Sequence, residues 1–376
     1  MWILNKISYK VNRKLYKSPL LYNISRKIAN TPVGGVALPN SEEALEILEA
    51  TSPRPTAHLN VPERRWPSKP TVDVSIIVPC YNVESFVEEC VSSIISQNTK
   101  RSFEVICIDD GSTDSTGEKL DQLAESDARI HVVHQENKGL SGSRNAGIAE
   151  AAGNTFMFVD SDDVLLPNAI EVLYDVYESN DCDFVTASYE IISEDGKTIH
   201  AVKGKRTHGA PWGRLYSRGI WRKLEFPENL WFEDTVQGFC IDDEWDNCYI
   251  DVPVLLYRQN RKGISKTSGK SKKSLDTIWI VDILLQWRSQ LSMKFNQAMY
   301  DRLIMQFGVL MWQRTAALSL REKRAMFIYA CDILENCDSN RKFKCSKKGR
   351  WKDLEQALRN RNYLLWRTAV MGIDVK

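Results

Sequence analysis

Hydrophobic and polar residues alternate along the middle of the chain in a pattern that predicts strands followed by helices. Residues 74–78 form a β-branched run typical of a strand buried on both faces of a parallel sheet. The residues after it, 83–95, repeat apolar side chains at the i, i+3, i+4, i+7 spacing of an amphipathic helix. The same alternation predicts strands at 103–108, 130–134, 156–159 and 183–188, and helices at 117–126, 141–152 and 168–178. It indicates right-handed βαβ units, and hence an α/β fold with a mostly parallel sheet flanked by helices.

The amino-terminal segment has a different pattern. The first 40 residues contain no Asp or Glu, and Ile3, Ile7, Val11 and Leu15 recur at helical spacing beside a stripe of lysines. Such a basic amphipathic helix can lie on an anionic membrane, or it can be an arm that packs on the protein or on a partner subunit. No apolar stretch follows the positive charges as it would in a secretory signal.

Proline spacing and a change of periodicity suggest the domain boundaries. Residues 31–70 are rich in proline and read as a linker with one short helix at 41–50, whereas 275–291, 295–318 and 322–336 read as long helices with no strand among them. We therefore expect an arm and linker at 1–70, an α/β domain at 71–268 and an all-helical module at 269–376. The module carries a basic cluster at 341–352, which is either a solvated face or a phosphate or lipid contact.

Composition narrows the class of protein. The 376 residues carry a formal net charge of +1, which offers no support for a nucleic-acid binder. No apolar run approaches the roughly 18 residues that span a bilayer. The nine cysteines are odd in number and lack paired metal-binding spacing. This cysteine usage is typical of a reducing compartment, so we expect a cytoplasmic protein.

The residues that follow the predicted strands are acidic, and ligands bind at the carboxyl ends of strands in open parallel sheets. Asp160 and Asp162 can face the same side and present hard oxygens to one divalent cation, or they can be solvated acids before the next helix. Asp110 can accept the imide N–H of a uracil while Tyr81 stacks on the base, although helix capping by the Asp109–Asp110 pair explains it equally well. Neither a G-x-G-x-x-G after the first strand nor a P-loop motif occurs, which argues against dinucleotide and P-loop folds.

Four stretches in order along the chain resemble the motifs of family 2 inverting glycosyltransferases with the GT-A fold. They are VSIIVPCYN at 74–82, IDDGSTD at 108–114, NKGLSGSRNAG at 137–147 and FVDSDD at 158–163. The resemblance covers roughly residues 72–265. It implies a Rossmann-like GT-A domain followed here by the helical module.

The resemblance also implies roles for individual residues on the donor side. It places a set of residues around the nucleotide sugar, with Asp110 on the uracil and Arg144 reaching the nucleotide or diphosphate: Pro79, Tyr81, Glu84, Asp110, Arg144, Asp160 and Ser161. It assigns a Mn²⁺ or Mg²⁺ ion to the D-x-D carboxylates, which here are Asp160, Asp162 and Asp163.

The acceptor side is implied by later segments. The sequence WFEDT at 231–235 resembles the family's E-D motif, so Asp234 is the expected catalytic base with Glu233 beside it; the alternative is that Asp234 caps a helix at 236–241. Trp212 and residues 214–216 resemble the acceptor-side strand region. Residues 257–258 and 264–265 resemble the segment that closes over the donor in relatives.

Together these features predict a metal-dependent inverting hexosyl- or N-acetylhexosaminyltransferase. It would move a sugar from a nucleotide sugar, here a UDP-sugar, to a hydroxyl of a glycan or lipid-linked acceptor in cell-surface polysaccharide synthesis, such as capsule. We expect it at the inner face of the cytoplasmic membrane, contacting it through residues 1–30, and a homo-oligomer is compatible with the sequence. The alternative is a non-catalytic nucleotide-sugar or polysaccharide-binding relative of the same fold. A nucleotidyltransferase fits less well, because no glycine-rich phosphate loop follows the first strand.

Overall fold

The computed structural model describes residues 18–31, 36–55, 59, 66–206, 209–260 and 268–373. The chain divides into two compact units. One comprises residues 57–263 and 283–293, and the other comprises 1–56, 264–282 and 294–376. The first unit is built on a β-sheet and the second on helices, and each is described by itself.

The sheet begins with a parallel half formed by the strands that the sequence pattern predicts. Its order is β3-β2-β1-β4-β8-β6-β9-β5, with β7 paired to β6. The parallel strands are β1 (Val72–Cys80), β2 (Phe103–Asp109), β3 (Ile130–His134) and β4 (Gly153–Phe158). Their carboxyl ends share one edge, because Cys80 pairs with Asp109 and Asp109 with His134. The residues that follow β1 and β2 therefore start out side by side.

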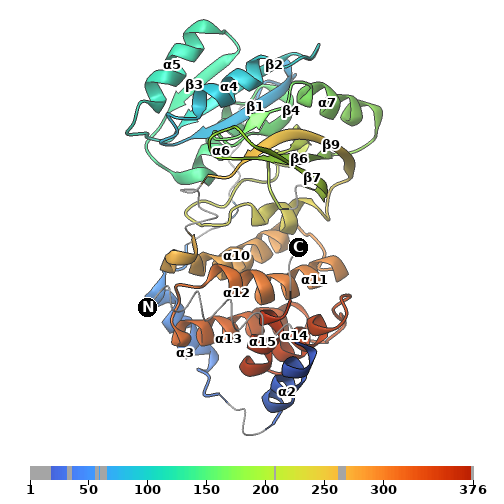
Figure 1. The fold of residues 1–376 in the computed structure, drawn as a ribbon. Coiled ribbons are helices and arrows are strands. Elements are labelled where there is room, and N and C mark those ends of the chain that lie inside the picture. Colours follow the sequence, from blue (N-terminus) through green and yellow to red (C-terminus); the bar gives the residue numbers. More distant parts are fainter. Residues whose placement is uncertain are drawn as a thin grey trace. The chain divides into compact units, whose positions relative to one another are not determined.

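Helices cover both faces of this parallel half. One face packs against α4 (Val87–Ile95), α5 (Thr116–Ser126) and α7 (Ala169–Ser179), with Val74, Ile76 and Val78 of β1 in the shared core (Figure 1). The other face packs against α6 (Gly139–Glu150). A Cβ at Gly147 would lie 2.4 Å from Ile77 Cγ2, so glycine there lets α6 approach β1 closely.

The second half of the sheet is mixed. It contains β5 (Val164–Leu165), β6 (Phe184–Ile192), β7 (Ile199–Arg206), β8 (Arg214–Ser217) and β9 (Asn247–Arg258). Strand β8 lies antiparallel between β4 and β6, whereas β6 and β9 are parallel. The short helix α8 (Arg218–Trp221) and the π-helix η2 (Gln237–Ile241) follow β8. Phe158, Tyr216, Trp221 and Phe226 form a buried aromatic cluster that joins β4 to this half.

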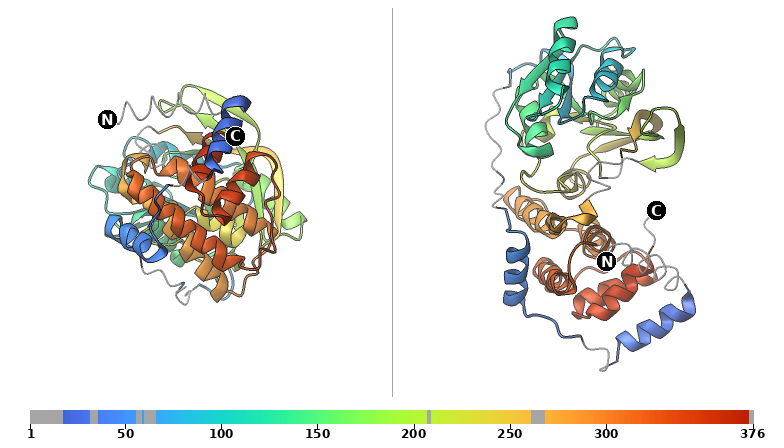
Figure 2. Two further views of the ribbon diagram at one scale, coloured as in Figure 1. Left: turned by 90° about the horizontal axis from the view of Figure 1, so that it is seen from below. Right: turned by 60° about the vertical axis from the view of Figure 1, so that its left-hand side comes forward.

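The helical unit draws on both ends of the chain. Helices α2 (Pro19–Ala29) and α3 (Ser41–Thr51) pack against the carboxyl-terminal helices, α2 on α15 (Tyr363–Met371) and α3 on α13 (Leu320–Cys337) (Figure 2). The remaining elements are the 3₁₀ turns η3 (Ser268–Lys270) and η4 (Lys272–Leu275), α11 (Gln297–Met305), the π-helix η5 (Gln306–Leu310), α12 (Met311–Arg314) and α14 (Arg350–Arg359). Helix α10 (Asp276–Gln290) begins in this unit, and its residues from 283 on belong to the sheet unit.

The α/β fold and the helices after residue 270 are as the sequence predicts. The stretch expected as one helix at 295–318 is divided, because a π-helical turn at η5 separates α11 from α12. The proposed helix at residues 3–15 lies outside the described residues. In the ranges that the structure describes, no helix has both the length and the apolar character needed to cross a membrane.

Candidate active site

The loop after β2 holds the carboxylate expected to bind the base. Asp110 is buried, and its Oδ1 accepts hydrogen bonds from Gln135 Nε2 at 2.6 Å and from the Lys138 backbone N–H at 2.8 Å. The chain turns at Gly111 with φ of 71°, and a Cβ there would lie 3.1 Å from the Asn137 nitrogen. The turn after β2 is therefore locked against the segment that leads into α6.

Asp109 faces the other side of the same loop. It accepts hydrogen bonds from the Ser112 backbone N–H at 3.1 Å and from His134 Nδ1 at 2.9 Å, and His134 Nε2 lies 3.0 Å from Asp121. Hydrogen bonds to Asp109 and then to Asp121 raise the pKa of His134. This histidine, the last residue of β3, therefore links β2 to α5.

The residues after β1 line the same edge. Pro79 is buried within the strand, whereas the Tyr81 side chain is 50% exposed next to the Asp110 loop. Asn82 has a left-handed backbone, with φ of 50°, and its side chain accepts the Thr113 backbone N–H at 2.8 Å. Glu84 Oε2 accepts the Ser115 hydroxyl at 2.6 Å, which lowers the pKa of Glu84. An exposed aromatic ring thus flanks a fixed carboxylate.

The loop after β4 carries the D-x-D carboxylates in unequal environments. Asp163 is fully buried and its Oδ1 accepts the Arg258 backbone N–H at 2.8 Å. Asp162 accepts a hydrogen bond from Asn260 Nδ2 at 3.0 Å. Burial raises the pKa of Asp162, with a further contribution from the nearby charge of Asp160. Burial followed by the Asp160 and Asp162 charges also holds the pKa of Asp163 well above its usual value.

Arg258, at the end of β9, holds the loop after β4 in place through hydrogen bonds. Its side chain is 2% exposed; Nε donates to the Asp162 carbonyl at 2.6 Å and Nη2 pairs with Glu89 at 2.6 Å. Nη1 donates to the Glu194 carbonyl at 3.2 Å. Residues 257–258 were expected in a closing segment, yet the Arg258 side chain is built into the sheet unit. Residues 264–265 lie outside the described part of the chain.

Arg144 joins the two motifs that are farthest apart in the site. Its side chain is 2% exposed; Nη2 lies 2.8 Å from Asp160 Oδ1 and Nη1 lies 2.7 Å from Glu233 Oε1. The guanidinium carbon is 5.2 Å from the centre of the Phe226 ring. Burial opposes the charge, but the two carboxylates outweigh it and raise the pKa of Arg144. One buried cation therefore brings the D-x-D loop and the E-D segment together.

The E-D segment itself is a tight turn. Phe232 has a left-handed φ of 67°, and the Thr235 N–H donates to its carbonyl at 2.9 Å. The helix that follows is the π-helix η2, and its first flanking residue is Val236, which makes no side-chain cap. Glu233 is buried in the ion pair with Arg144, and the next residue, Asp234, is half-buried. Thr235 and Val236 are already helical and run directly into η2, so Asp234 stands just before the helix, and both of its expected roles, catalytic base and helix cap, stay predictions.

The carboxylates after β4 are the candidate ligands for a metal ion. Among the residues that the structure describes, no group of three His, Cys, Asp or Glu side chains is arranged to hold a metal ion. Asp163, the third residue of the expected set, is fully buried, and its Oδ1 accepts the Arg258 backbone N–H. Asp160 and Asp162 interact electrostatically with each other, and one or two carboxylates plus phosphate oxygens are the usual protein contribution to a Mg²⁺ site. These two carboxylates would fit the protein's share of a divalent-cation site.

Of the residues expected near the acceptor, some are buried in β8, and Trp212, just before β8, stacks on another aromatic ring. Arg214 and Tyr216 are buried in β8, where Arg214 Nη1 lies 2.7 Å from Asp242 and the Tyr216 hydroxyl donates to Gln237 Oε1 at 2.8 Å. Trp212 stacks on Tyr257 with ring centres 5.1 Å apart. The β8 residues therefore support the E-D segment through Gln237, which begins η2.

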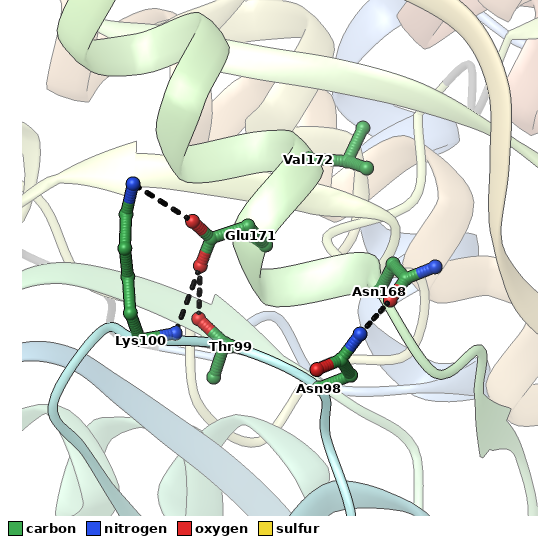
Figure 3. Close-up of a pocket in the computed structure, with 6 residues that line it drawn as sticks. All are labelled: Asn98, Thr99, Lys100, Asn168, Glu171 and Val172. Atoms are coloured by element: carbon green, nitrogen blue, oxygen red, sulfur yellow. Dashed lines mark hydrogen bonds and ion pairs between the residues drawn. The ribbon is translucent and has the colours of Figure 1, made fainter.

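A cavity of about 340 Å³ lies away from these carboxylates, before β2 and at the start of α7 (Figure 3). Its polar groups pair with one another: Thr99 donates to Glu171 at 2.5 Å, and Asn98 donates to Asn168 at 3.1 Å. Because these groups are already satisfied within the protein, this cavity adds nothing to the site.

The sequence interpretation missed the residues that hold the loops in place. Gln135, His134, Arg258 and Asn260 each bind a carboxylate or carbonyl of the site. Arg258 had a detectable signal, since it is a charged residue that directly ends the apolar run 252–257. The other three had no distinctive spacing.

Part of the chain is similar to known proteins. Residues 75–240 match the model of Glycosyl transferase family 2. The chain is 32% identical over 194 residues to glycosyltransferase GlyA of Streptococcus pneumoniae, covering 51% of this chain and 26% of that protein. It is 44% identical over 221 residues to the uncharacterized glycosyltransferase EpsJ of Bacillus subtilis, covering 52% of this chain and 64% of that protein. The chain thus spans between about a quarter and two thirds of the length of these relatives.

A solved structure shares the fold. The crystal structure of Staphylococcus aureus TarS 1-349 in complex with UDP matches with a TM-score of 0.51 at 17% identity, covering 79% of this chain and 90% of that one. At this identity the match concerns the fold alone. Residues 75–240 of this chain thus match glycosyl transferase family 2, the same part of the chain is similar to curated glycosyltransferases, and the fold is shared with the TarS structure.

Proposed function

We propose that the protein is an inverting glycosyltransferase that moves a sugar from a nucleotide sugar, most simply a UDP-sugar, to an acceptor hydroxyl. The observation that carries the proposal is the buried Arg144, which pairs with Asp160 at 2.8 Å and with Glu233 at 2.7 Å. This contact supports the proposal because it joins the loop at 160–163 and the segment at 231–235 through one side chain. A transferase needs that proximity, because the donor carbon and the acceptor oxygen must meet.

The donor would lie along the carboxyl edge of the parallel strands. Tyr81, half-exposed after β1, offers a face for the base, and the fixed Asp110 carboxylate can accept the N–H of a uracil. Glu84 and Pro79 flank this position on the β1 side. Ser161 and Asp160 would contact the nucleotide sugar beyond it. Arg144 would act on the nucleotide through Asp160, since both of its Nη atoms are already engaged by carboxylates.

The leaving diphosphate has to be neutralised as its bond to the sugar breaks. Asp160 and Asp162 would hold a Mn²⁺ or Mg²⁺ ion there, and such an ion, when bound, stabilises the developing charge on the phosphate oxygens. Arg258 and Asn260 fix the Asp162 backbone and carboxylate for this task.

Asp234 would act as the general base. As the acceptor oxygen forms its bond to the anomeric carbon, the bond from that carbon to the diphosphate oxygen breaks on the opposite face, and the hydroxyl proton passes to Asp234. A single displacement of this kind inverts the configuration, and the transition state has oxocarbenium character. Glu233, held by Arg144, would fix the turn that presents Asp234.

The partners follow from the same proposal. The acceptor would be a glycan or lipid-linked saccharide hydroxyl, and the process would be cell-surface polysaccharide synthesis of the capsule or cell-envelope type. The enzyme would work at the inner face of the cytoplasmic membrane. Contact with that membrane through residues 1–30 and homo-oligomer formation stay predictions.

The test is a screen of UDP-, GDP- and dTDP-sugars with Mn²⁺, read first as a rise in melting temperature and then as release of free nucleotide. A ligand that binds the folded state raises its apparent stability. Stabilisation by one donor class together with metal-dependent nucleotide release supports the proposal. Stabilisation without release in the presence of oligosaccharide and lipid-linked acceptors supports the non-catalytic binding relative instead.

A further inference from the structure

Helix α2 exposes an apolar stripe on the side that faces away from the rest of its unit. Leu20, Ile24 and Ile28 repeat every fourth residue and are 70%, 46% and 53% exposed, and Leu21 extends the stripe. On a helix such residues share one side, whereas Tyr22 and Ala29, seven residues apart, mark the opposite side. Both of these are buried. The helix therefore docks through one face and leaves its more apolar face to solvent.

The docked face is fastened to the start of α14. The Tyr22 hydroxyl donates to Asp353 Oδ2 at 2.5 Å, and Arg26 Nε lies 2.8 Å from Asp353 Oδ1. The Arg350 guanidinium lies 4.0 Å from the centre of the Tyr22 ring. Both ribbon views show α2 beside the carboxyl-terminal helices (Figures 1 and 2). Helix α2 is thus held at the start of α14, beside the last residues of the segment 341–352.

Residues 341–352 form a basic surface whose neighbouring acids are used internally. Asp338 is buried and bound by Arg359, and Asp353 is occupied by α2. Asp301 and Glu355 accept backbone N–H groups of this segment. In the part of the chain that the structure describes, no ion pair joins a carboxylate to the six exposed basic side chains, which are Arg341, Lys342, Lys344, Lys347, Lys348 and Lys352.

An aromatic side chain completes the arrangement. Trp351 is half-buried beside the basic residues, and Lys347 Nζ lies 4.2 Å from the centre of its ring. Tryptophan at the edge of an apolar surface, with lysines around it, is typical of segments that lie at the level of lipid headgroups. A soluble polyanion would use the lysines but would leave the apolar stripe uncovered.

From these contacts we infer that the stripe of α2 and the basic surface of residues 341–352 together dock on an anionic lipid bilayer. The apolar side chains would enter the boundary of the acyl chains while the lysines meet the headgroup phosphates. The inference rests on one part of the proposed function, the membrane contact of residues 1–30, and deepens it: it names the stripe of α2 (Pro19–Ala29), adds residues 341–352, and uses no residue of the proposed active site.

The test is flotation of the full chain with vesicles of phosphatidylcholine alone and of phosphatidylcholine with 30% phosphatidylglycerol. One variant combines Lys347→Gln, Lys348→Gln and Lys352→Gln, and a second combines Leu20→Ser, Ile24→Ser and Ile28→Ser. The matched controls are Lys69→Gln, Lys100→Gln and Lys197→Gln for charge, and Leu45→Ser, Val252→Ser and Leu320→Ser for exposed apolar area. Melting temperatures confirm that each variant is folded.

We expect binding to the anionic vesicles only. Removing three lysines should weaken it about a hundredfold, since each basic residue near an anionic surface contributes about 1 kcal/mol, a factor of roughly five. The serine variant should weaken it at least about tenfold through lost apolar burial, and both controls should bind as wild type.

Three results would overturn the inference. The first is that both triple variants bind vesicles as well as the wild type does. This includes the case in which only a deletion of residues 1–17 abolishes binding. The second is that the wild-type protein sediments as a dimer and does not bind vesicles, whereas the serine variant sediments as a monomer. The stripe would then be the contact with a second copy of the chain. The third is equal capture by soluble polyphosphate that the serine variant leaves unchanged.

Discussion

The two acidic loops at the carboxyl edge of the sheet are held in different ways. The Asp109–Asp110 loop is fixed by residues within 28 positions of it, among them Ser112, His134 and Lys138. The Asp160–Asp163 loop is instead fixed on one side by Arg144 and on the other by Arg258, which is 95 positions from Asp163 along the chain. Both arginines are almost completely buried.

The two loops differ in the charge of the groups that hold them. Asp110 receives neutral amide donors, Gln135 and a backbone N–H, and these leave the loop net negative at a half-exposed edge. The D-x-D loop gathers three carboxylates, which repel one another when unpaired, so it is braced by cations that water cannot screen. We therefore expect the D-x-D loop to depend on its arginines far more than the Asp110 loop depends on its neighbours.

Replacing Arg144 should have the largest effect. Arg144→Met would leave Asp160 and the buried Glu233 without their cation, and removing one partner of a buried ion pair typically costs about 3–5 kcal/mol. Urea unfolding measures this loss. The control is Arg101→Met, whose partners Asp175 and Glu178 are more than half exposed, and it should cost less than about 1 kcal/mol. Equal losses in the two variants would contradict the role of Arg144.

Replacing Arg258 should have the next largest effect. Arg258→Met removes hydrogen bonds to the Asp162 and Glu194 carbonyls, and hydrogen bonds from a charged group contribute about 1.5–3 kcal/mol. Its ion pair with Glu89 adds little, because the Glu89 side chain is 53% exposed. Urea unfolding should show the loss, and Arg258→Lys should recover only part of it, since lysine lacks the guanidinium fork. Stability equal to wild type in Arg258→Met would show that the brace is not needed.

The Asp110 loop can be tested on binding rather than on stability. Asp110→Asn should weaken UDP binding by roughly 10- to 100-fold, because a hydrogen bond to a charged acceptor is replaced by one to a neutral amide. Calorimetric titration with UDP measures the change. Asp121→Asn, on the same face of the domain but bound only to His134 in the described contacts, serves as the control. Unchanged affinity in Asp110→Asn would place the base elsewhere.

The smallest effect concerns pH. Because Asp109 and Asp121 raise the pKa of His134 above 6.5, the folded state binds the proton more tightly than the unfolded state does. This stabilisation is present below about pH 6.5 and is lost as the pH rises through the raised pKa. His134→Gln should therefore lower stability by less than about 1 kcal/mol near pH 6 and hardly at all near pH 9, since the side chain is half-exposed. Unfolding at both pH values checks this, and a loss that grows with pH would refute it.

The sequence predicted one part of this site better than the other. Strands β1 to β4 and their acidic ends could be located because β-branched runs and helical spacing are local signals. The buried arginines that hold the loops could not be predicted in this way. The pairing of Arg144 with Glu233, for example, depends on how residues 89 positions apart in the chain pack together. Helix α2 was not predicted either, because its apolar stripe faces outward and so does not report a buried face.

The most direct test of the whole account is Asp234→Asn, assayed for nucleotide release from the donor that the screen identifies and for nucleotide binding by calorimetry. The account predicts that binding is retained, because Asp234 does not contact the base or diphosphate in the proposed arrangement. It predicts that turnover falls by roughly 10²–10⁴-fold, the usual contribution of a general base. Turnover close to wild type with binding intact would contradict the assignment of Asp234 and, with it, the proposed reaction geometry.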